Sequence, residues 1–266
     1  MGALFTTRAL LGAPYDADAL AWRRAVVAQG GPVSAAQLAR IARLVRALKA
    51  RGVWDRLDRL WIFAAENATQ ALTDLRTRSL ATLSPTPPGF TALRGFIGNG
   101  MSAYVDLGVA ASALTKFTQN AGHLSLYLRD GDGVTNAFIG ARDNGSGFSS
   151  EVVWGSSTTM NFLIQTAGAP TSFGQSAQNG FHIAERSSAT TGIVSNNGVD
   201  EGSQTIATSS SRATSNLAVL ARNTSGTYSV FSGSRIGALT VGGALGGAGR
   251  AALYQAMGGC LTSVGA

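Results

Sequence analysis

Three glutamates, Glu151, Glu185 and Glu201, are the residues of this chain best suited to acid–base chemistry. Hydrolysis of a glycosidic bond needs two carboxyl groups, one as acid and one as nucleophile or base. An E-x-D-x-x-E pattern would place such carboxylates on one strand, and the residues after each of the three glutamates do not follow it. A glycan hydrolase would therefore have to assemble its acids from different strands.

Other catalytic and metal-binding sets are sparse. His123 and His182 leave a Ser-His-Asp triad open, but no G-x-S-x-G segment occurs, so we interpret both histidines as ordinary sheet residues. The single cysteine, Cys260, excludes a disulfide within the chain and a cysteine-based metal site. Two histidines are too few for a zinc cluster. We expect no catalysis, no metal centre and no cofactor.

Carbohydrate binding has a few candidate residues. The segment Asp130-Gly-Asp-Gly133 places two carboxylates two residues apart, as calcium loops do, but it lacks the later acidic ligands of an EF-hand, and we interpret it as a hairpin tip. Aromatic rings and nearby amides on loops are typical of sugar-binding sandwiches, although a buried core position is the other interpretation of the tryptophan. The predicted sugar-binding residues are Asp130, Asp132, Asn144 and Trp154, with Phe173, Asn179 and Tyr228 also available.

Two glycine-rich stretches resemble phosphate loops only superficially. "GFIGNGMSAYVDLG", from Gly95 to Gly108, has no helix behind its glycines, which a phosphate loop requires. "GGALGGAGR", from Gly242 to Arg250, lacks the Lys-Ser/Thr pair of a P-loop. The first stretch predicts a turn into a strand, and the second predicts a turn followed by a helix.

The front of the chain is helical and basic. "PVSAAQLARIARLVRALKARG" begins with Ser34 as N-cap, stops at Gly52 and carries one apolar stripe. Residues 1–90 hold twelve of the 21 basic and six of the 14 acidic residues of the chain. The stripe consists of Leu38, Ile41, Val45 and Leu48, and the predicted docking residues beside it are Arg40, Arg43 and Arg46.

Two roles are open for this basic front. It can dock onto an acidic or polar assembly surface, or residues 1–85 can cover one face of the body so that the stripe is buried. The spread of arginines around the helix disfavours a DNA-binding helix-turn-helix, and we expect no nucleic-acid partner. We see no apolar run that would insert into a membrane, and the first residues make a poor signal peptide.

The rest of the chain is rich in short alternating segments. Leu124, Leu126 and Leu128 alternate with polar residues, and Asn197-Gly198 is a strong hairpin signal. The segments recur near every ten residues, and the chain has 34 glycines and only 13% charged residues. We predict a mainly β fold: an antiparallel jelly-roll sandwich over residues 86–266 that ends in a helix, preceded by a helical segment over residues 1–85.

One segment carries a resemblance to a family. "FTALRGFIGNGMSAYVDLG" resembles the entry segment F-T-x-x-R-G-[YF]-x-G-N-G-x-S-x-Y-[ILV]-D-x-G of phage and prophage structural proteins with a concanavalin A-like (laminin-G-like) sandwich. Weaker similarities extend over residues 50–264. Domains of this family act as virion decorations, as fibre or spike parts, and as sugar-binding heads.

The resemblance implies a virion structural protein that displays a sandwich head, with attachment to a host surface as one role of that head. Its partners would then be other virion proteins and copies of itself, with a cell-surface glycan as a further candidate, and it would be assembled in the bacterial cytoplasm. The first alternative is a lectin-like carbohydrate-binding module. The second alternative is a glycan hydrolase.

Overall fold

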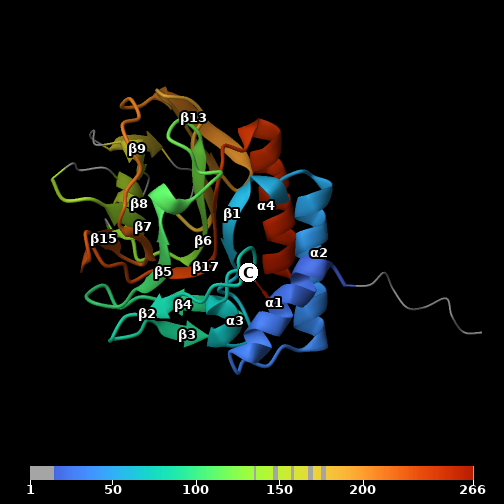
Figure 1. Cartoon of the computed structure of the whole chain (residues 1–266). Helices are drawn as coiled ribbons and strands as arrows, with labels where there is room; N and C mark the ends of the chain where they lie inside the picture. The colour runs from blue at the N-terminus through green and yellow to red at the C-terminus, as the bar shows by residue number, and fades with distance from the viewer. Residues whose placement is uncertain are drawn as a thin grey trace, which may run out of the picture.

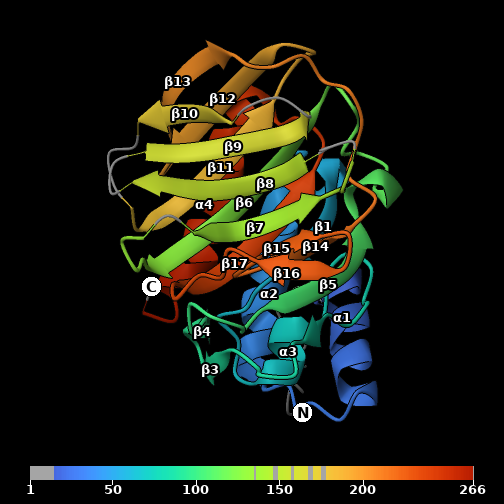
Figure 2. The same cartoon turned by 90° about the vertical axis from the view of Figure 1, so that its left-hand side faces the viewer.

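Three layers build the molecule: two antiparallel sheets face each other, and helices cover the outer face of one of them (Figure 1). The computed structural model describes residues 15–134, 136–145, 149–156, 159–166, 170–174 and 178–265, without the side chains of residues 153–156. Viewed from the side of the second sheet, α4 (Gly246–Thr262) lies behind both sheets, whereas the short α3 (Ala68–Leu72) lies below the second sheet (Figure 2). The predicted mainly β sandwich with an N-terminal helical segment and a C-terminal helix is confirmed.

The eight-stranded sheet lies in the middle of the three layers. Its order is β13-β12-β11-β6-β17-β4-β3, and β1 also pairs with β17. The strands are β1 (Leu57–Trp61), β3 (Gly89–Thr91), β4 (Gly95–Ile97), β6 (Gly122–Asp130), β11 (Gly180–Arg186), β12 (Thr191–Asn196), β13 (Val199–Thr205) and β17 (Arg235–Gly242).

The nine-stranded sheet forms the outer wall of the sandwich. Its order is β10-β9-β8-β7-β14-β5-β2, and β15 joins β7 in a parallel pair and carries β16. The strands are β2 (Thr82–Leu83), β5 (Val105–Ala110), β7 (Ala137–Arg142), β8 (Ser149–Ser156), β9 (Thr159–Thr166), β10 (Thr171–Gly174), β14 (Asn216–Val219), β15 (Arg222–Thr224) and β16 (Thr227–Ser229).

The alternating leucines of β6 fill the core between the two sheets. Leu124, Leu126 and Leu128 are all at most 1% exposed and belong to one apolar cluster with residues of the opposite sheet, such as Phe138 and Phe162. Period-two alternation places these side chains on one face of the strand. The inward orientation predicted for the three leucines is confirmed.

The helices form the third layer. They are α1 (Ala17–Ala28), α2 (Ala35–Ala50), the short α3 (Ala68–Leu72) and α4 (Gly246–Thr262), and two 3-10 turns occur at Trp54–Arg56 and Ala111–Ala113. Ser34 accepts a hydrogen bond from the Gln37 amide at 3.0 Å, as the predicted N-cap should. The stripe of α2 is buried in a second apolar cluster, together with α4 and the outer face of β11 and β17. The helical layer therefore covers the sheet.

Strands from both sides of the predicted boundary near residue 85 share hydrogen-bonded sheets. β1 pairs with β17 in the central sheet, and β2 pairs with β5 in the outer sheet. The N-terminal segment thus contributes strands to both sheets, and its helices cover one of them.

The connection after Asp130 differs from the predicted hairpin. β6 belongs to the central sheet and β7 to the outer sheet, so the segment between them crosses from one sheet to the other. A sequence pattern of two strands around a glycine turn does not distinguish a hairpin from such a crossing. The Asn197-Gly198 hairpin is confirmed, with positive φ at both residues between β12 and β13.

The glycine-rich stretch from Gly95 to Gly108 bends the chain against β17. A Cβ on Gly95 would lie 2.2 Å from the carbonyl oxygen of Ile236, and one on Gly98 would lie 1.8 Å from that of Ser232. No helix follows in this stretch, and the chain continues into β5. The glycines therefore allow backbone to approach backbone, as the predicted turn requires.

We predict that Leu126→Ala lowers the free energy of unfolding by about 3 kcal/mol, because it opens a cavity between the two sheets. Urea denaturation measures this change. The matched control is Leu80→Ala, since Leu80 is 45% exposed and its truncation should change the free energy of unfolding by about 0.5 kcal/mol or less. Equal effects of the two substitutions would contradict the described core.

Candidate functional site

A pocket of about 260 Å³ lies where the C-terminal half of α4 meets the ends of β6, β11 and β12. Three aromatic rings line it: Tyr127 from β6, Phe181 from β11 and Tyr254 from α4. The two tyrosines are partly exposed, while Phe181 is buried and lies 6.5 Å from the Tyr254 ring. The remaining lining residues are Asn179, Gly180, Asn197, Gly258, Leu261 and Thr262.

The hairpin at Asn197 sets the polar side of this pocket. The Asn197 backbone amide donates to the Phe181 carbonyl, and the Phe181 amide donates back to Asn197 Oδ1, both at 2.9 Å. This reciprocal pair holds the Asn197 side chain and leaves its Nδ2 group for another acceptor. The phenol hydroxyls of Tyr127 and Tyr254 also have no hydrogen-bond partner in the described part of the chain.

Glycines make room for the groups of the pocket. A Cβ on Gly198 would lie 2.4 Å from the Tyr254 ring, and one on Gly180 would lie 2.3 Å from Asn197 Oδ1. Both glycines also have positive φ, at 82° and 134°. The turn can therefore approach the ring and the amide closely only because these two positions lack side chains.

The predicted sugar-binding carboxylates lie near this pocket but are engaged in other contacts. Asp130 lies 2.9 Å from Arg235 and 3.5 Å from Arg94. Asp132 accepts hydrogen bonds from the backbone of Gly233 and the side chain of Asn136. Both carboxylates stabilise the crossing between the sheets, and no cluster of three potential metal ligands occurs among the described residues.

The amide and aromatic candidates are scattered. Asn179 lies in the pocket, and its Oδ1 accepts from the Gly131 amide at 2.8 Å. Asn144 is exposed on the loop after β7, far along the chain from any pocket residue, and its backbone amide donates to Ser225. The side chain of Trp154 lies outside the described residues. The structure thus places Asp130 and Asp132 at the crossing after β6 and Asn144 on the loop after β7.

The two other aromatic candidates are not sugar platforms. Phe173 is 1% exposed and stacks on Phe162 in the core. Tyr228 stacks on Tyr104 with ring centroids 3.7 Å apart, and its hydroxyl donates to Asp106 at 2.7 Å. Sequence analysis missed Tyr127, Phe181 and Tyr254, because no local pattern distinguishes them from core aromatics.

The predicted docking arginines of α2 separate into two kinds. Arg40 is only 5% exposed and donates to the Ala64 carbonyl at 2.9 Å, so it is not the surface group that we expected. Its position beside the apolar stripe faces α4, which the sequence of α2 alone does not reveal. Arg43 and Arg46 are exposed.

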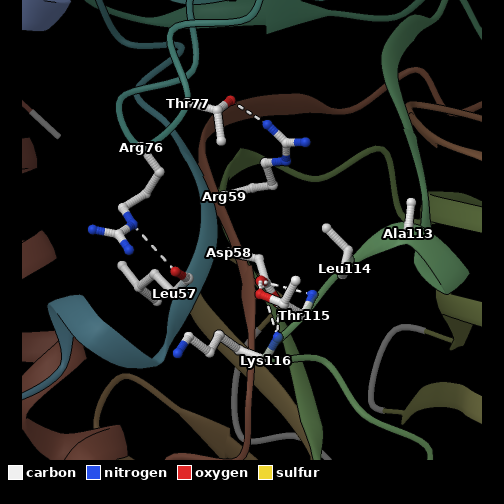
Figure 3. A pocket seen from close by; sticks show the side chains of 9 residues that line it. All are labelled: Leu57, Asp58, Arg59, Arg76, Thr77, Ala113, Leu114, Thr115 and Lys116. Carbon is white, nitrogen blue, oxygen red and sulfur yellow. Dashed lines mark hydrogen bonds between the residues drawn. The ribbon is translucent and has the colours of Figure 1, made fainter.

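A second, more polar cavity of about 230 Å³ lies beside β1 (Figure 3). Asp58 accepts hydrogen bonds there from the backbone of Thr115, Lys116 and Phe117. Arg59 pairs with the Asp74 carboxylate at 3.0 Å and also donates to Thr77. The Asp58 bonds attach the loop before β6 to β1, and the Arg59 bonds attach the segment after α3 to β1. Together they occupy most of the polar groups that a ligand would need.

Glu185 and Glu151 lie in different sheets, and an arginine stands beside each of them. Glu185 accepts from the amides of Leu245 and Gly246 at the start of α4 and from Arg250 at 3.0 Å. Glu151 lies in the other sheet, where burial raises its pKa and Arg222 stands 3.6 Å away. The carboxylate of Glu185 thus lies at the N-terminus of α4, beside the glycine-rich stretch from Gly242 to Arg250.

Both histidines lie within the central sheet. His123 contacts the Gly243 carbonyl at 2.7 Å and Thr240 at 2.9 Å, and His182 contacts the Gln178 carbonyl at 2.6 Å. Burial lowers the pKa of His123 and lowers that of His182 to about 4. Both rings are therefore neutral at pH 7, in agreement with the interpretation as sheet residues.

Comparison with known proteins finds similarity in structure alone. No family model matches the chain, and no curated protein matches it. A mutant of Trypanosoma rangeli sialidase displaying trans-sialidase activity has 12% identity over 85% of this chain and 40% of its own, with a TM-score of 0.53. The binding domain of botulinum neurotoxin serotype D has 9% identity over 76% of this chain and 52% of its own, also with a TM-score of 0.53.

These similarities concern the β-sandwich, and they are consistent with a concanavalin A-like jelly roll. The chain spans about 40–52% of the length of these two structures. The expected virion role finds no support in either of them and stays a prediction. No helix in the described part of the chain is both long and apolar enough to cross a membrane.

We predict that the chain loses stability as the pH falls from 7 to 5, partly through His182. The unfolded chain binds a proton at this histidine near pH 6.5, whereas the folded chain does so only near pH 4. Between these values the unfolded state holds more protons, so acid favours unfolding, by about 2 kcal/mol for this group. Urea denaturation of the wild type and of His182→Gln at both pH values measures the difference, and equal pH dependence in the two proteins would contradict it.

Proposed function

We propose that this chain is a carbohydrate-binding β-sandwich module, and that the pocket between α4 and the central sheet is its sugar site. The observation that carries the proposal is the combination of three aromatic rings with two side-chain amides around one small cavity. A sugar ring has apolar C–H faces that pack on aromatic rings and hydroxyl groups that bond to amides. The volume of about 260 Å³ lies just below the range of drug-sized ligand sites, which favours one or two sugar units.

The polar groups of the pocket favour an uncharged sugar as the ligand. Tyr127 and Tyr254 offer partly exposed rings with unbonded hydroxyls, and Asn197 offers an Nδ2 donor whose side chain is already held by Phe181. A donor that is fixed before binding loses little conformational freedom when the ligand arrives. Among the residues that the structure describes, no acidic or basic side chain lines the pocket.

The names of similar structures agree with a glycan ligand. One is a Trypanosoma rangeli sialidase in complex with sialic acid, which has 12% identity to this chain and a TM-score of 0.53. At this identity the likeness concerns the fold, so the ligand class is carried over here only as part of the proposal.

We further propose that the chain binds without hydrolysing. Glu185 accepts hydrogen bonds from the Gly246 amide of α4 and from Arg250. The charged side chains that act on Glu151 are the arginines Arg222 and Arg142. A glycosidase needs two carboxyl groups on opposite sides of the scissile bond. Removal of Glu151 alone should therefore change no chemistry on polysaccharides.

We also propose that this module is part of a virion. It rests on the resemblance of the segment from Phe90 to Gly108 to phage and prophage structural proteins. In that setting the module would be assembled in the bacterial cytoplasm with copies of itself and with other virion proteins, and the pocket would serve attachment to a surface glycan.

We predict that the full chain binds at least one glycan on an array, and that Tyr254→Ala weakens this binding at least tenfold. Loss of the ring removes about 1.4–2 kcal/mol of stacking and buried apolar contact, which corresponds to about ten- to thirtyfold in the dissociation constant. Isothermal titration with the glycan selected on the array measures the change. Tyr254→Phe should retain most of the affinity, because it keeps the ring.

Tyr104→Ala is the matched control, because Tyr104 is also partly exposed but stacks on Tyr228 away from the pocket. It should leave the affinity within twofold of the wild type. Circular dichroism of each variant separates lost binding from lost folding. An array without any bound glycan, or equal losses from Tyr254→Ala and Tyr104→Ala, would contradict the proposal.

A further inference from the structure

The polar cavity of about 230 Å³ beside β1 has more cationic than acidic side chains in its lining. Three cations line it: Arg59 from β1, Arg76 from the segment after α3, and Lys116 from the loop before β6. Asp58 is the one acidic residue among the described residues that line it. Arg59 and Arg76 are seen above Asp58 in Figure 3, and Lys116 below it. An anion would therefore find a positive excess here.

Asp58 does not neutralise these cations, because the backbone already binds its carboxylate. It accepts hydrogen bonds of 2.8–3.0 Å from the amides of Thr115, Lys116 and Phe117, and one of 2.9 Å from the Thr115 hydroxyl. The same bonds hold in place the loop that carries Lys116. Even when Asp74, the ion-pair partner of Arg59, is counted, the cations outnumber the carboxylates.

Arg59 offers two free donors on one edge of its guanidinium. Its Nη1 donates to Asp74 at 3.0 Å and to Thr77, which fixes the group in place. Its Nε and Nη2 have no hydrogen-bond partner in the described part of the chain, and they are not among its buried atoms. The side chain is 19% exposed. Nε–H and Nη2–H are parallel, and this edge binds an oxyanion with two hydrogen bonds.

The other two cations are also positioned without being neutralised. Arg76 Nε donates to the Leu57 carbonyl at 3.2 Å, and its guanidinium carbon lies 4.5 Å from the centroid of the Trp54 ring. Its two terminal nitrogens have no hydrogen-bond partner in the part of the chain that the structure describes, and neither is buried. Lys116 is exposed. A group that is already held loses little conformational freedom when a ligand binds.

We propose that this cavity binds a phosphate group through the Nε and Nη2 edge of Arg59, with Arg76 and Lys116 supplying further positive charge and donors. A volume below the range of drug-sized sites favours a ligand of this size. The cavity shares no lining residue with the sugar pocket among the residues that the structure describes. The proposal therefore does not depend on the proposed function.

The phosphate group can come from two sources, a free phosphate ion or a phosphate ester on a sugar. Three probes distinguish them: inorganic phosphate, glucose 6-phosphate, and glucose as the uncharged control. Each is titrated into the full chain by isothermal titration calorimetry, at an ionic strength held constant with sodium chloride so that general screening cancels. Saturable binding of inorganic phosphate shows that the free ion suffices. Binding of glucose 6-phosphate alone shows that the group is recognised on a sugar.

We predict that Arg59→Lys weakens the binding of the phosphate probe at least about tenfold. A lysine keeps a positive charge beside Asp74 but lacks the two parallel N–H groups. Tyr254→Ala, in the sugar pocket, should leave this affinity within about twofold of the wild type, because Tyr254 does not line the cavity.

A second variant keeps Arg59 intact. The double substitution Arg76→Gln with Lys116→Gln should weaken the binding at least about fivefold, because it removes two charges from the lining. Arg43→Gln with Arg46→Gln is the matched control: it removes two charges as well, but both arginines are exposed on α2 and neither lines the cavity. It should change the affinity less than about twofold. Circular dichroism checks the folding of each variant.

Two results would overturn the proposal. In the first, inorganic phosphate does not saturate the wild type up to about 10 mM, and glucose 6-phosphate binds no more tightly than glucose. In the second, the Arg76 and Lys116 double variant loses no more affinity than the Arg43 and Arg46 double variant. The second comparison also decides the matter if Arg59→Lys does not fold.

Discussion

A buried ion pair fixes α4 on the central sheet, and the aromatic pocket beside α4 depends on this placement. Glu185 of β11 receives the first amides of α4, from Leu245 and Gly246, and the Arg250 guanidinium at 3.0 Å. The side chains of Glu185 and Arg250 are 1% and 5% exposed, so water does not solvate either charge if the other is removed. The carboxylate also complements the positive end of the helix. Once α4 is held in this way, Tyr254, Gly258 and Leu261 close the aromatic pocket.

The central sheet is covered on both faces, which explains where ligand sites are found. One face of β6 packs its leucines against the outer sheet, and the other contributes Tyr127 to the cluster under the helices. A sheet covered twice offers little open face to a ligand. The described cavities that involve α4 therefore lie along the two sides of this helix, one between α4 and the central sheet and one between α4 and α2. Glycines such as Gly198 and Gly259 leave space there.

Local patterns predicted the elements well, and they failed where contact partners are distant along the chain. The leucine alternation of β6, the Ser34 cap and the Asn197-Gly198 turn each depend on neighbouring residues, and each is confirmed. The burial of Arg40 depends on α4, more than 200 residues later, and the Asp130 segment crosses between sheets whose pairing no local pattern specifies. The pocket joins Tyr127 and Tyr254 for the same reason, so its residues could be recognised only once α4 was placed.

A double-mutant cycle on the pair that holds α4 tests this account most directly. The cycle uses Glu185→Gln, Arg250→Gln and both together, with urea denaturation as the measurement, and a second cycle pairs Asp200→Asn with Arg250→Gln. Asp200 also binds Arg250, at 2.6 Å, but is 47% exposed, so it is the matched control. We predict a coupling energy of about 2–3 kcal/mol for the buried pair and below about 1 kcal/mol for the exposed one. Coupling below about 0.5 kcal/mol for Glu185 and Arg250, or stronger coupling for Asp200, would contradict it.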